Sequence, residues 1–283
     1  MSISSDLTRI KNAKSAIITS ITNKGVTVPS GTKIDGLAPL INKISTGATR
    51  QTVSSLGYVN KAYAFAFDGQ YPYGGYAKPS PTANLGGLID LVNGVGMSIF
   101  TPNSSGANYW STIGSDGTTL TSCTIGCHSS GYALTKTFTI EVTFSFVNSL
   151  VNNAYNYVWA LQYDSGSTTL LRLLYNSGLK FDYGSYSYTI LSSSEVSVGS
   201  KYCVQIRSAS GEGFDIFVNG VRKYHNDKAI SLGAASNQWY KFTLGAKNAS
   251  KYNYYSLRAF AGWLTDAELT QNYNKDKARF GIT

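Results

Sequence analysis

Runs in which apolar and polar residues alternate fill the chain from Leu56 onward and constrain its fold more than any other feature. Such period-two alternation is typical of strands with one buried face, and turn residues separate the runs about every eight to twelve residues. Asn219–Gly220, for example, is a type I′ hairpin sequence. This spacing predicts an antiparallel sandwich. The clearest runs are Tyr63–Asp68, Phe138–Phe146, Tyr155–Tyr163, Leu170–Tyr175, Leu179–Tyr183, Tyr186–Ile190, Lys201–Arg207, Phe214–Val218 and Lys241–Leu244.

The composition fits an extracellular β protein. Only 14% of the 283 residues are charged, and Gly, Ser, Thr, Asn and Tyr take their place. The formal charge is +9, but no basic run of the kind that follows a phosphate backbone is present, so we expect no nucleic acid partner. Two interpretations of the charge stay open: an ordinary solvated surface, or attraction to anionic cell-wall polymers.

The three cysteines do not form a disulfide framework, because their number is odd. Cys123 and Cys127 lie close enough in sequence to pair or to stay reduced, and Cys203 lies in a predicted strand where a buried thiol is expected. Cys127–His128 is too sparse for a zinc site, which needs about four ligands.

The N-terminal residues contain no apolar signal-peptide core, and no apolar run approaches the ~20 residues of a membrane span. We therefore expect synthesis in a host cytoplasm without a signal peptide and no insertion into a membrane.

The first part of the chain is predicted to be helical. Apolar residues from Ile3 to Ile21 recur at alternating spacings of four and three, interrupted by Lys14. This pattern predicts a helix with a seam of about three heptads, which packs either on its own chain or against other copies. A second helix is predicted over Ile34–Ile44. The predicted organisation is a helical segment over residues 1–45, a small polar linker over 46–55 and a β domain over 56–283.

The last residues predict a strand, a turn and a capped helix. Thr265 and Glu268 have the spacing of a capping box, in which each side chain accepts an amide of the other residue. Leu264, Leu269 and Tyr273 supply the apolar face of the helix. We expect this helix to dock on the sandwich.

This closing segment resembles that of concanavalin A-like, laminin-G-type jelly rolls, which occur on many phage and prophage tail proteins. Phe138–Phe144, Phe214–Gly220 and Ile89–Gly94 also resemble elements of that family, in the same order. The resemblance implies a mostly β fold, an antiparallel jelly-roll sandwich preceded by a small α-helical N-terminal segment. It also implies calcium as a candidate cofactor, although Asp68, Asp164, Asp182 and Asp227 do not have the dense spacing of a self-contained site.

The run Ile10–Ile44 resembles a recurring N-terminal segment of phage tail and baseplate proteins. That resemblance implies attachment to the virion tail, contacts with other tail or baseplate proteins, and a homotrimer.

Catalysis is not expected from the sequence. Glycoside hydrolysis needs two carboxylates that flank one bond. The four glutamates, Glu141, Glu195, Glu212 and Glu268, have no partner carboxylate on the same strand face, and Glu141 is expected to face solvent. Neither His128 nor His225 lies in a triad motif. We therefore predict that the chain is not an enzyme and has no catalytic residue.

Tyrosine, at 21 residues, is the strongest sign of binding. A tyrosine ring can pack on a sugar while its hydroxyl donates to the sugar oxygens. The predicted function is that of a phage tail receptor-binding protein whose jelly roll binds a bacterial surface polysaccharide. A purely structural virion protein and, less favoured, a glycan-cleaving enzyme are the alternatives. The candidate contacts, taken to lie in exposed loops or strand ends, are Tyr71, Tyr73, Tyr76, Asp182, Tyr183, Tyr186, Trp239 and Tyr252.

Overall fold

The structure is a computed structural model of the chain. It describes residues 3–23, 28–37, 52–70, 91–92, 98–100, 110–114, 117–120, 123–126, 134, 137–147, 150, 152, 157–163, 169–232, 240–244 and 252–283. The chain divides into two compact units, Met1–Thr49 and Arg50–Thr283, which are described separately.

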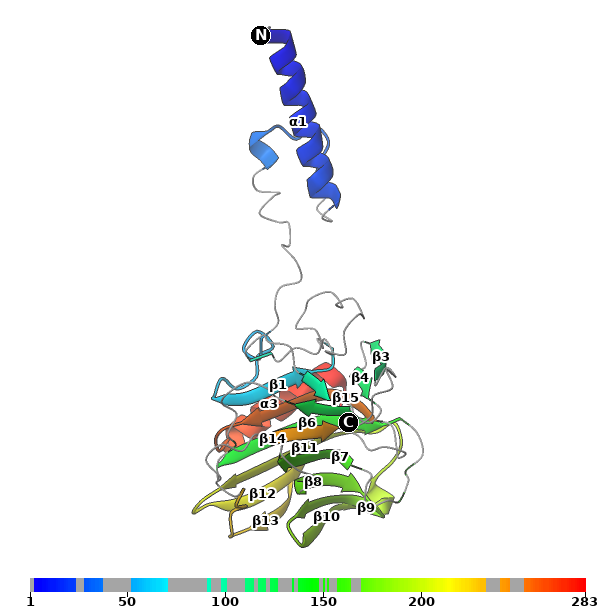
Figure 1. The fold of residues 1–283 in the computed structure, drawn as a ribbon, viewed down its shortest axis with the longest axis vertical. Coiled ribbons are helices and arrows are strands. Elements are labelled where there is room, and N and C mark those ends of the chain that lie inside the picture. Colours follow the sequence, from blue (N-terminus) through cyan, green and yellow to red (C-terminus); the bar gives the residue numbers. More distant parts are fainter. Residues whose placement is uncertain are drawn as a thin grey trace. The chain divides into compact units, whose positions relative to one another are not determined.

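The first unit contains helix α1 (Ile3–Asn23) and the short 3-10 helix η1 (Asp35–Leu37) (Figure 1). The predicted first helix is therefore confirmed. Its seam is largely uncovered, because Leu7, Ile10 and Ile17 are 56%, 49% and 41% exposed, whereas Ile21 is buried. The second predicted helix begins as η1, and the rest of it lies outside the described residues.

The second unit is an antiparallel sandwich of two sheets, as the sequence predicts (Figure 1). The eight-stranded sheet has the order β13-β12-β11-β6-β15-β4-β3, with β1 also paired to β15, and the seven-stranded sheet has the order β10-β9-β8-β7-β14-β5-β2. The strands are β1 (Tyr63–Asp68), β2 (Ser98–Phe100), β3 (Trp110–Gly114), β4 (Gly117–Leu120), β5 (Cys123–Gly126), β6 (Phe138–Phe146), β7 (Tyr157–Tyr163), β8 (Thr169–Tyr175), β9 (Gly178–Tyr183), β10 (Tyr186–Ser192), β11 (Lys201–Ala209), β12 (Gly213–Val218), β13 (Val221–Asn226), β14 (Tyr240–Leu244) and β15 (Tyr252–Phe260), with a 3-10 turn η2 (Ser193–Glu195) after β10.

The described apolar side chains of most alternating runs lie between the two sheets. Phe138, Phe144, Trp159 and Phe181 are fully buried there, in one continuous core. The predicted hairpin turn is also confirmed, since Asn219 and Gly220 both have positive φ, at 49° and 77°. Cys203 is a free, buried thiol on β11, as expected.

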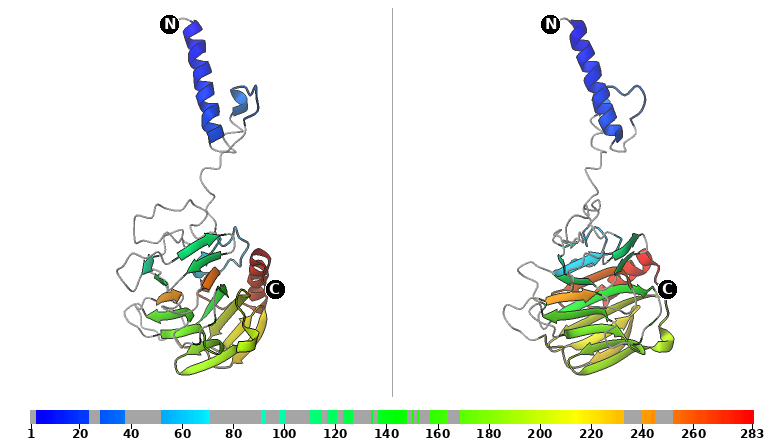
Figure 2. Two further views of the ribbon diagram at one scale, coloured as in Figure 1. Left: turned by 90° about the vertical axis from the view of Figure 1, so that its right-hand side faces the viewer. Right: turned by 45° about the vertical axis from the view of Figure 1, so that its right-hand side comes forward.

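Helix α3 (Asp266–Phe280) lies against the outer face of the eight-stranded sheet (Figure 2). The predicted capping box is present: the Glu268 amide donates to the Thr265 hydroxyl, and the Thr265 amide donates to the Glu268 carboxylate. Gly281 ends the helix in the left-handed conformation. Leu264 and Leu269 are buried, whereas Tyr273 is half-buried beside the Gly220 turn.

Replacing Thr265 with alanine is expected to lower the free energy of unfolding by about 0.5–2 kcal/mol, because the Glu268 amide loses its acceptor. Thr265→Ser keeps the hydroxyl and is the matched control. Urea titrations of the three proteins measure the difference, and equal midpoints for wild type and Thr265→Ala would contradict a stabilising cap.

Residues 52–58, partly assigned to the linker, belong to the second unit. They form hydrogen-bonded turns, including Leu56 N to Thr52 O at 3.1 Å, and Val53 is buried with Ala66 and Leu91. The second unit therefore starts before the predicted position 56. The functions assigned to the three predicted segments stay predictions.

Across the described ranges, no helix combines the length and apolar character that a membrane crossing requires.

Candidate functional site

The structure separates the candidate ligand residues into three groups. Tyr71, Tyr73, Tyr76 and Trp239 lie outside the described residues. Tyr252 was expected in an exposed loop, and that prediction is wrong. It is fully buried on β15, where its ring packs against Phe144 and Phe146.

The remaining candidates, Asp182, Tyr183 and Tyr186, lie on one hairpin formed by β9 and β10. Gly184, with a φ of 58°, lies in its turn. Tyr183 and Tyr186 are directly paired across the two strands, and Asp182 is paired with Ser187. Because side chains alternate along a strand, Asp182 lies on the opposite face from the two tyrosines.

The structure adds two rings that sequence reasoning did not select, Tyr188 on β10 and Tyr224 on β13. The Tyr186 and Tyr188 rings are nearly parallel with centroids 6.3 Å apart, and the Tyr188 and Tyr224 centroids are 4.6 Å apart. β10 and β13 are the last strands of their sheets and lie side by side (Figure 1). Tyr183, Tyr186, Tyr188 and Tyr224 thus lie where the edges of the two sheets meet, and this set is called the tyrosine edge.

The tyrosine edge combines exposed aromatic surface with polar groups. Tyr186 is 62% exposed, and Tyr188 and Tyr224 are half-buried. The Ser231 amide donates to the Tyr183 hydroxyl at 2.9 Å, and the Asn226 amide group donates to the Tyr224 hydroxyl at 3.3 Å. Partial burial, followed by the neighbouring phenols of Tyr224 and Tyr186, raises the pKa of Tyr188. These rings and hydroxyls have the chemistry that sugar recognition requires.

Asp182 is almost fully buried and forms an ion pair on the other face of the same hairpin. The Arg172 Nε donates to its Oδ2 at 2.6 Å. Its Oδ1 is buried and has no hydrogen-bond donor within the described part of the chain. Whether these residues contact a glycan stays a prediction.

His225 connects the β13 edge to the start of helix α3. Its Nδ1 lies 2.8 Å from Asp215 Oδ1, and its Nε2 lies 3.0 Å from Asp227 Oδ1. Asp215 is buried and also accepts from the Arg207 Nε at 2.9 Å, and Arg207 in turn pairs with Asp266 of α3.

Replacing His225 with glutamine is expected to flatten the dependence of the melting temperature on pH above pH 6.5, the ordinary pKa of histidine. Hydrogen bonds to Asp215 and Asp227 raise the pKa of His225 in the folded protein. The stabilising contribution is therefore complete below the unfolded pKa and is lost as the pH rises through the folded one. Thermal melts at a series of pH values measure this loss, and an equal slope in both proteins would contradict it.

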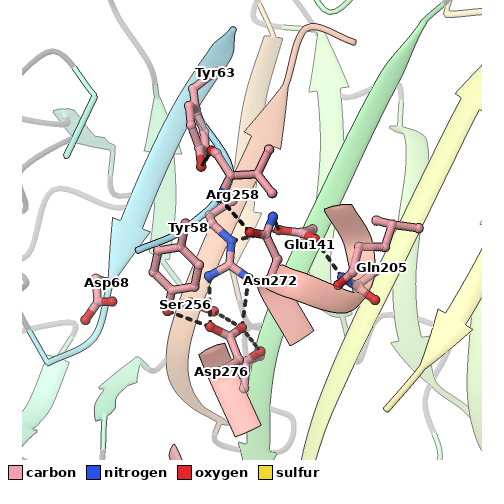
Figure 3. A network of polar contacts seen from close by, with 12 residues as sticks. Tyr58, Tyr63, Asp68, Glu141, Gln205, Ser256, Arg258, Asn272 and Asp276 are labelled. Carbon is pink, nitrogen blue, oxygen red and sulfur yellow. Dashed lines mark hydrogen bonds and ion pairs between the residues drawn. The ribbon is translucent and has the colours of Figure 1, made fainter. Parts of the chain in front are cut away.

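A second polar cluster lies under helix α3 (Figure 3). Arg258 of β15 donates from Nε to Glu141 Oε2 at 2.7 Å, and from its two terminal nitrogens to both Asp276 oxygens at 2.8 and 2.9 Å. Its guanidinium also stacks on the Tyr58 ring, with the carbon 4.1 Å from the ring centroid. The expectation that Glu141 faces solvent is wrong, because α3 covers this face and Glu141 is 0% exposed.

Further side chains complete the cluster. Glu141 accepts from Gln205 at 2.7 Å and Asn272 at 2.9 Å, and Asp276 accepts from Tyr58 at 2.6 Å, Thr143 at 2.6 Å and Ser256 at 2.8 Å.

The two carboxylates of the cluster differ in their titration. Burial raises the pKa of Glu141 despite the nearby Arg258. Burial also acts to raise the pKa of Asp276, but Arg258 together with the hydrogen bonds from Thr143 and Tyr58 outweighs it and holds that pKa below its ordinary value. With its acceptors satisfied and its side chains buried, the cluster fastens α3 to the sheet.

No three His, Cys, Asp or Glu side chains gather into a metal site within the described ranges. Asp68 accepts from Arg279 at 2.6 Å, and Asp182 accepts from Arg172. Calcium binding stays a prediction.

Comparisons with known proteins identify the fold. No family model and no curated protein match the sequence. Trypanosoma rangeli sialidase bound to 2,3-difluoro-KDN matches at a TM-score of 0.55 and 12% identity, over 97% of this chain and 40% of that chain. The binding domain of botulinum neurotoxin serotype D matches at a TM-score of 0.51 and 11% identity, over 76% of this chain and 51% of that chain. The receptor binding domain of the C/D mosaic neurotoxin matches at a TM-score of 0.51 and 11% identity, over 76% of this chain and 52% of that chain.

These comparisons correct the prediction that the chain is not an enzyme. The sialidase that shares the fold is an enzyme, so the prediction that this chain is not an enzyme, drawn from its unpaired glutamates, does not stand. The chain spans about two fifths of the sialidase and about half of each toxin domain. At these identities the likeness establishes the fold alone.

Proposed function

We propose that this chain is a receptor-binding protein of a phage tail. In this proposal the N-terminal helical unit attaches the protein to other tail or baseplate proteins as a homotrimer, and the β unit binds a bacterial surface polysaccharide. The observation that carries the proposal is the tyrosine edge, where a 62% exposed Tyr186 continues a row of rings between the two sheets. Large exposed apolar surface on a folded domain commonly marks a binding site.

Two further observations support a sugar ligand. Amide groups donate to two hydroxyls of the tyrosine edge, the Asn226 side chain to Tyr224 and the Ser231 backbone to Tyr183, and such polar groups suit sugar hydroxyls. The solved structures of the same fold include a sialidase in complex with sialic acid and a toxin receptor binding domain. These findings favour a surface glycan as the receptor, and the resemblance of Ile10–Ile44 to tail proteins supplies the proposed location on the virion.

Replacing Tyr186 with alanine is expected to weaken binding to host cells or extracted wall glycan by about 1–2 kcal/mol, a five- to thirtyfold rise in Kd. The loss follows from removing the most exposed ring of the tyrosine edge. Val221→Ala is the matched control, because Val221 is 58% exposed on the neighbouring edge strand. Binding isotherms of the full chain on a panel of glycans measure both variants.

The same incubations are analysed for released sugars, which reports any cleavage of the bound glycan. A well-folded protein that binds no wall fraction would overturn the receptor-binding proposal and favour a structural virion role. Equal losses of glycan affinity for Tyr186→Ala and Val221→Ala would contradict a binding site at the tyrosine edge.

A further inference from the structure

One short segment, residues 224–231, supplies two polar contacts of the tyrosine edge. The Asn226 side-chain amide donates to the Tyr224 hydroxyl at 3.3 Å. The Ser231 amide donates to the Tyr183 hydroxyl at 2.9 Å. The segment starts on β13, the last of the described strands in its sheet, so the ladder holds it from one side only. The contacts of its other side chains therefore affect where these polar groups lie.

His225 contacts two carboxylates from the middle of this segment. Its Nδ1 lies 2.8 Å from Oδ1 of Asp215 on β12, and its Nε2 lies 3.0 Å from Oδ1 of Asp227. An ionised carboxylate only accepts hydrogen bonds, so each ring nitrogen needs a proton to donate. A neutral imidazole carries one such proton and the imidazolium carries two. The geometry of the two contacts therefore fits the imidazolium.

The charges around this histidine also favour the imidazolium. Arg207 of β11 and Arg222 of β13 approach the buried Asp215 at 2.8 and 3.7 Å. Arg207 also pairs with Asp266 of α3 at 2.5 Å. With Asp227, three carboxylates face two guanidiniums within the described part of the chain, and an imidazolium cancels the excess negative charge. The hydrogen bond to Asp215, followed by the one to Asp227, raises the pKa of the histidine accordingly.

We propose that the His225 imidazolium is a positioning residue of the tyrosine edge, which holds the segment in place by binding Asp215 and Asp227 together. The inference rests on the proposed function and adds a regulation of that same site by pH. The Asp215 side chain is 3% exposed and the Asp227 side chain is 98% exposed, so water can replace the imidazole only at Asp227. After deprotonation the remaining N–H therefore stays on Asp215.

Loss of that proton detaches the segment on one side. The Nε2 lone pair then faces the Asp227 carboxylate, and two acceptors without a proton between them repel each other. Asp227 directly follows Asn226, whose side-chain oxygen accepts from the Lys228 amide at 2.8 Å. Movement of Asp227 therefore displaces the turn that orients the Asn226 amide toward Tyr224.

Glycan binding of the full chain at a series of pH values tests this coupling. Affinity for extracted wall glycan is expected to be highest below pH 6.5, the ordinary pKa of histidine. As the pH rises through the raised pKa of His225, affinity is expected to fall about three- to fivefold, the size of an exposed charged pair. An affinity that does not change with pH would overturn the proposal.

Asp227→Asn is the diagnostic variant, because an asparagine side chain can donate to Nε2 of the neutral imidazole or accept from the imidazolium. Its glycan affinity is therefore expected to be independent of pH. Lys228→Gln is the matched control, since it also changes one exposed charge in the same turn but leaves the contact of His225 with Asp227 intact. This control is expected to keep the pH dependence of the wild type. A pH dependence that survives in Asp227→Asn, or is lost in Lys228→Gln, would overturn the positioning role.

Nuclear magnetic resonance of the full chain separates this inference from the proposed function, because it needs no glycan. The amide resonances of Ser231 and of the Asn226 side chain are expected to shift with the titration midpoint of the His225 ring in the wild type and not in Asp227→Asn. Shared midpoints in a protein that binds no wall glycan would overturn the receptor-binding proposal and leave the positioning role standing. Amide resonances that ignore the His225 titration would overturn the positioning role, even in a protein that binds glycan.

Discussion

Replacing Arg258 with alanine is expected to lower the free energy of unfolding by about 3–5 kcal/mol, because it leaves two buried carboxylates without their cation. Arg258 is 1% exposed and supplies hydrogen bonds to both Glu141 and Asp276, neither of which is exposed. The loss is expected to appear as a large shift of the urea midpoint together with early melting of α3.

Arg222→Ala is the matched control for that experiment. Arg222 is 54% exposed at the side chain, and its nearest carboxylate oxygen, on Asp215, is 3.7 Å away. Exposed pairs of this kind contribute about 0–1 kcal/mol. A similar small effect for Arg258→Ala would mean that water enters the cluster and that α3 is held by its apolar contacts instead.

Replacing Gly213 with alanine is expected to lower the free energy of unfolding by about 3–5 kcal/mol, a loss typical of severe overpacking. Gly213 begins β12 with a φ of 78°, and an added Cβ would lie 2.0 Å from the Asn226 carbonyl oxygen. Because the clashing atom belongs to the backbone of β13, the clash can be relieved only by moving β13 away from β12. The displaced β13 carries Tyr224, so glycan binding is expected to weaken as well.

Gly211 provides an unusually close comparison for Gly213. It lies in the same turn with a φ of 89°, but an added Cβ would meet nothing within 4 Å. Gly211→Ala is therefore expected to lower the free energy of unfolding by only about 1–2 kcal/mol, the cost of a left-handed backbone for alanine. Chemical denaturation and glycan-binding measurements compare Gly213→Ala with Gly211→Ala. Equal losses of stability in the two variants would contradict a steric clash at Gly213.

The alternating runs were sufficient to predict most strands and the sandwich, because period two and the turn residues are local properties. The same alternation misled the assignment of the outer face of β6. Glu141 and Thr143 alternate with apolar residues and suggest a solvated face, yet both are fully buried under α3. The segment that covers this face of β6 is α3, which lies more than a hundred residues later in the chain, so the local sequence pattern of β6 could not predict its burial.

The docking of α3 on the sandwich was predicted, but the polar residues on its buried side were not identified. Leu269, Asn272, Asp276 and Phe280 recur at helical spacing on one side, and all four are buried. A polar pair at core spacing predicts a buried polar contact rather than an apolar one. Its partner Arg258 could not be identified without the register of β15.

The tyrosines show the limit of sequence for the candidate site. Tyr252 and Tyr186 both follow polar residues and both begin strands, but one is 0% and the other 62% exposed. The difference is the position of the strand, since β15 is central in its sheet and β10 is at an edge. Tyr188 and Tyr224 joined the site only through the packing of two edge strands.

The central position of β15 has a consequence for biosynthesis. β15 is made after all the other strands that the structure describes, yet it pairs with β6, β1 and β4 and so joins the middle of the eight-stranded sheet. Until it emerges, β6 has one open edge and β1 has no strand to pair with among those described. Unpaired edges of this kind are prone to aggregation, so a nascent chain of this type depends on rapid completion or on chaperones. Slow codons late in the message would therefore be expected to lower the yield of folded protein more than slow codons early in it.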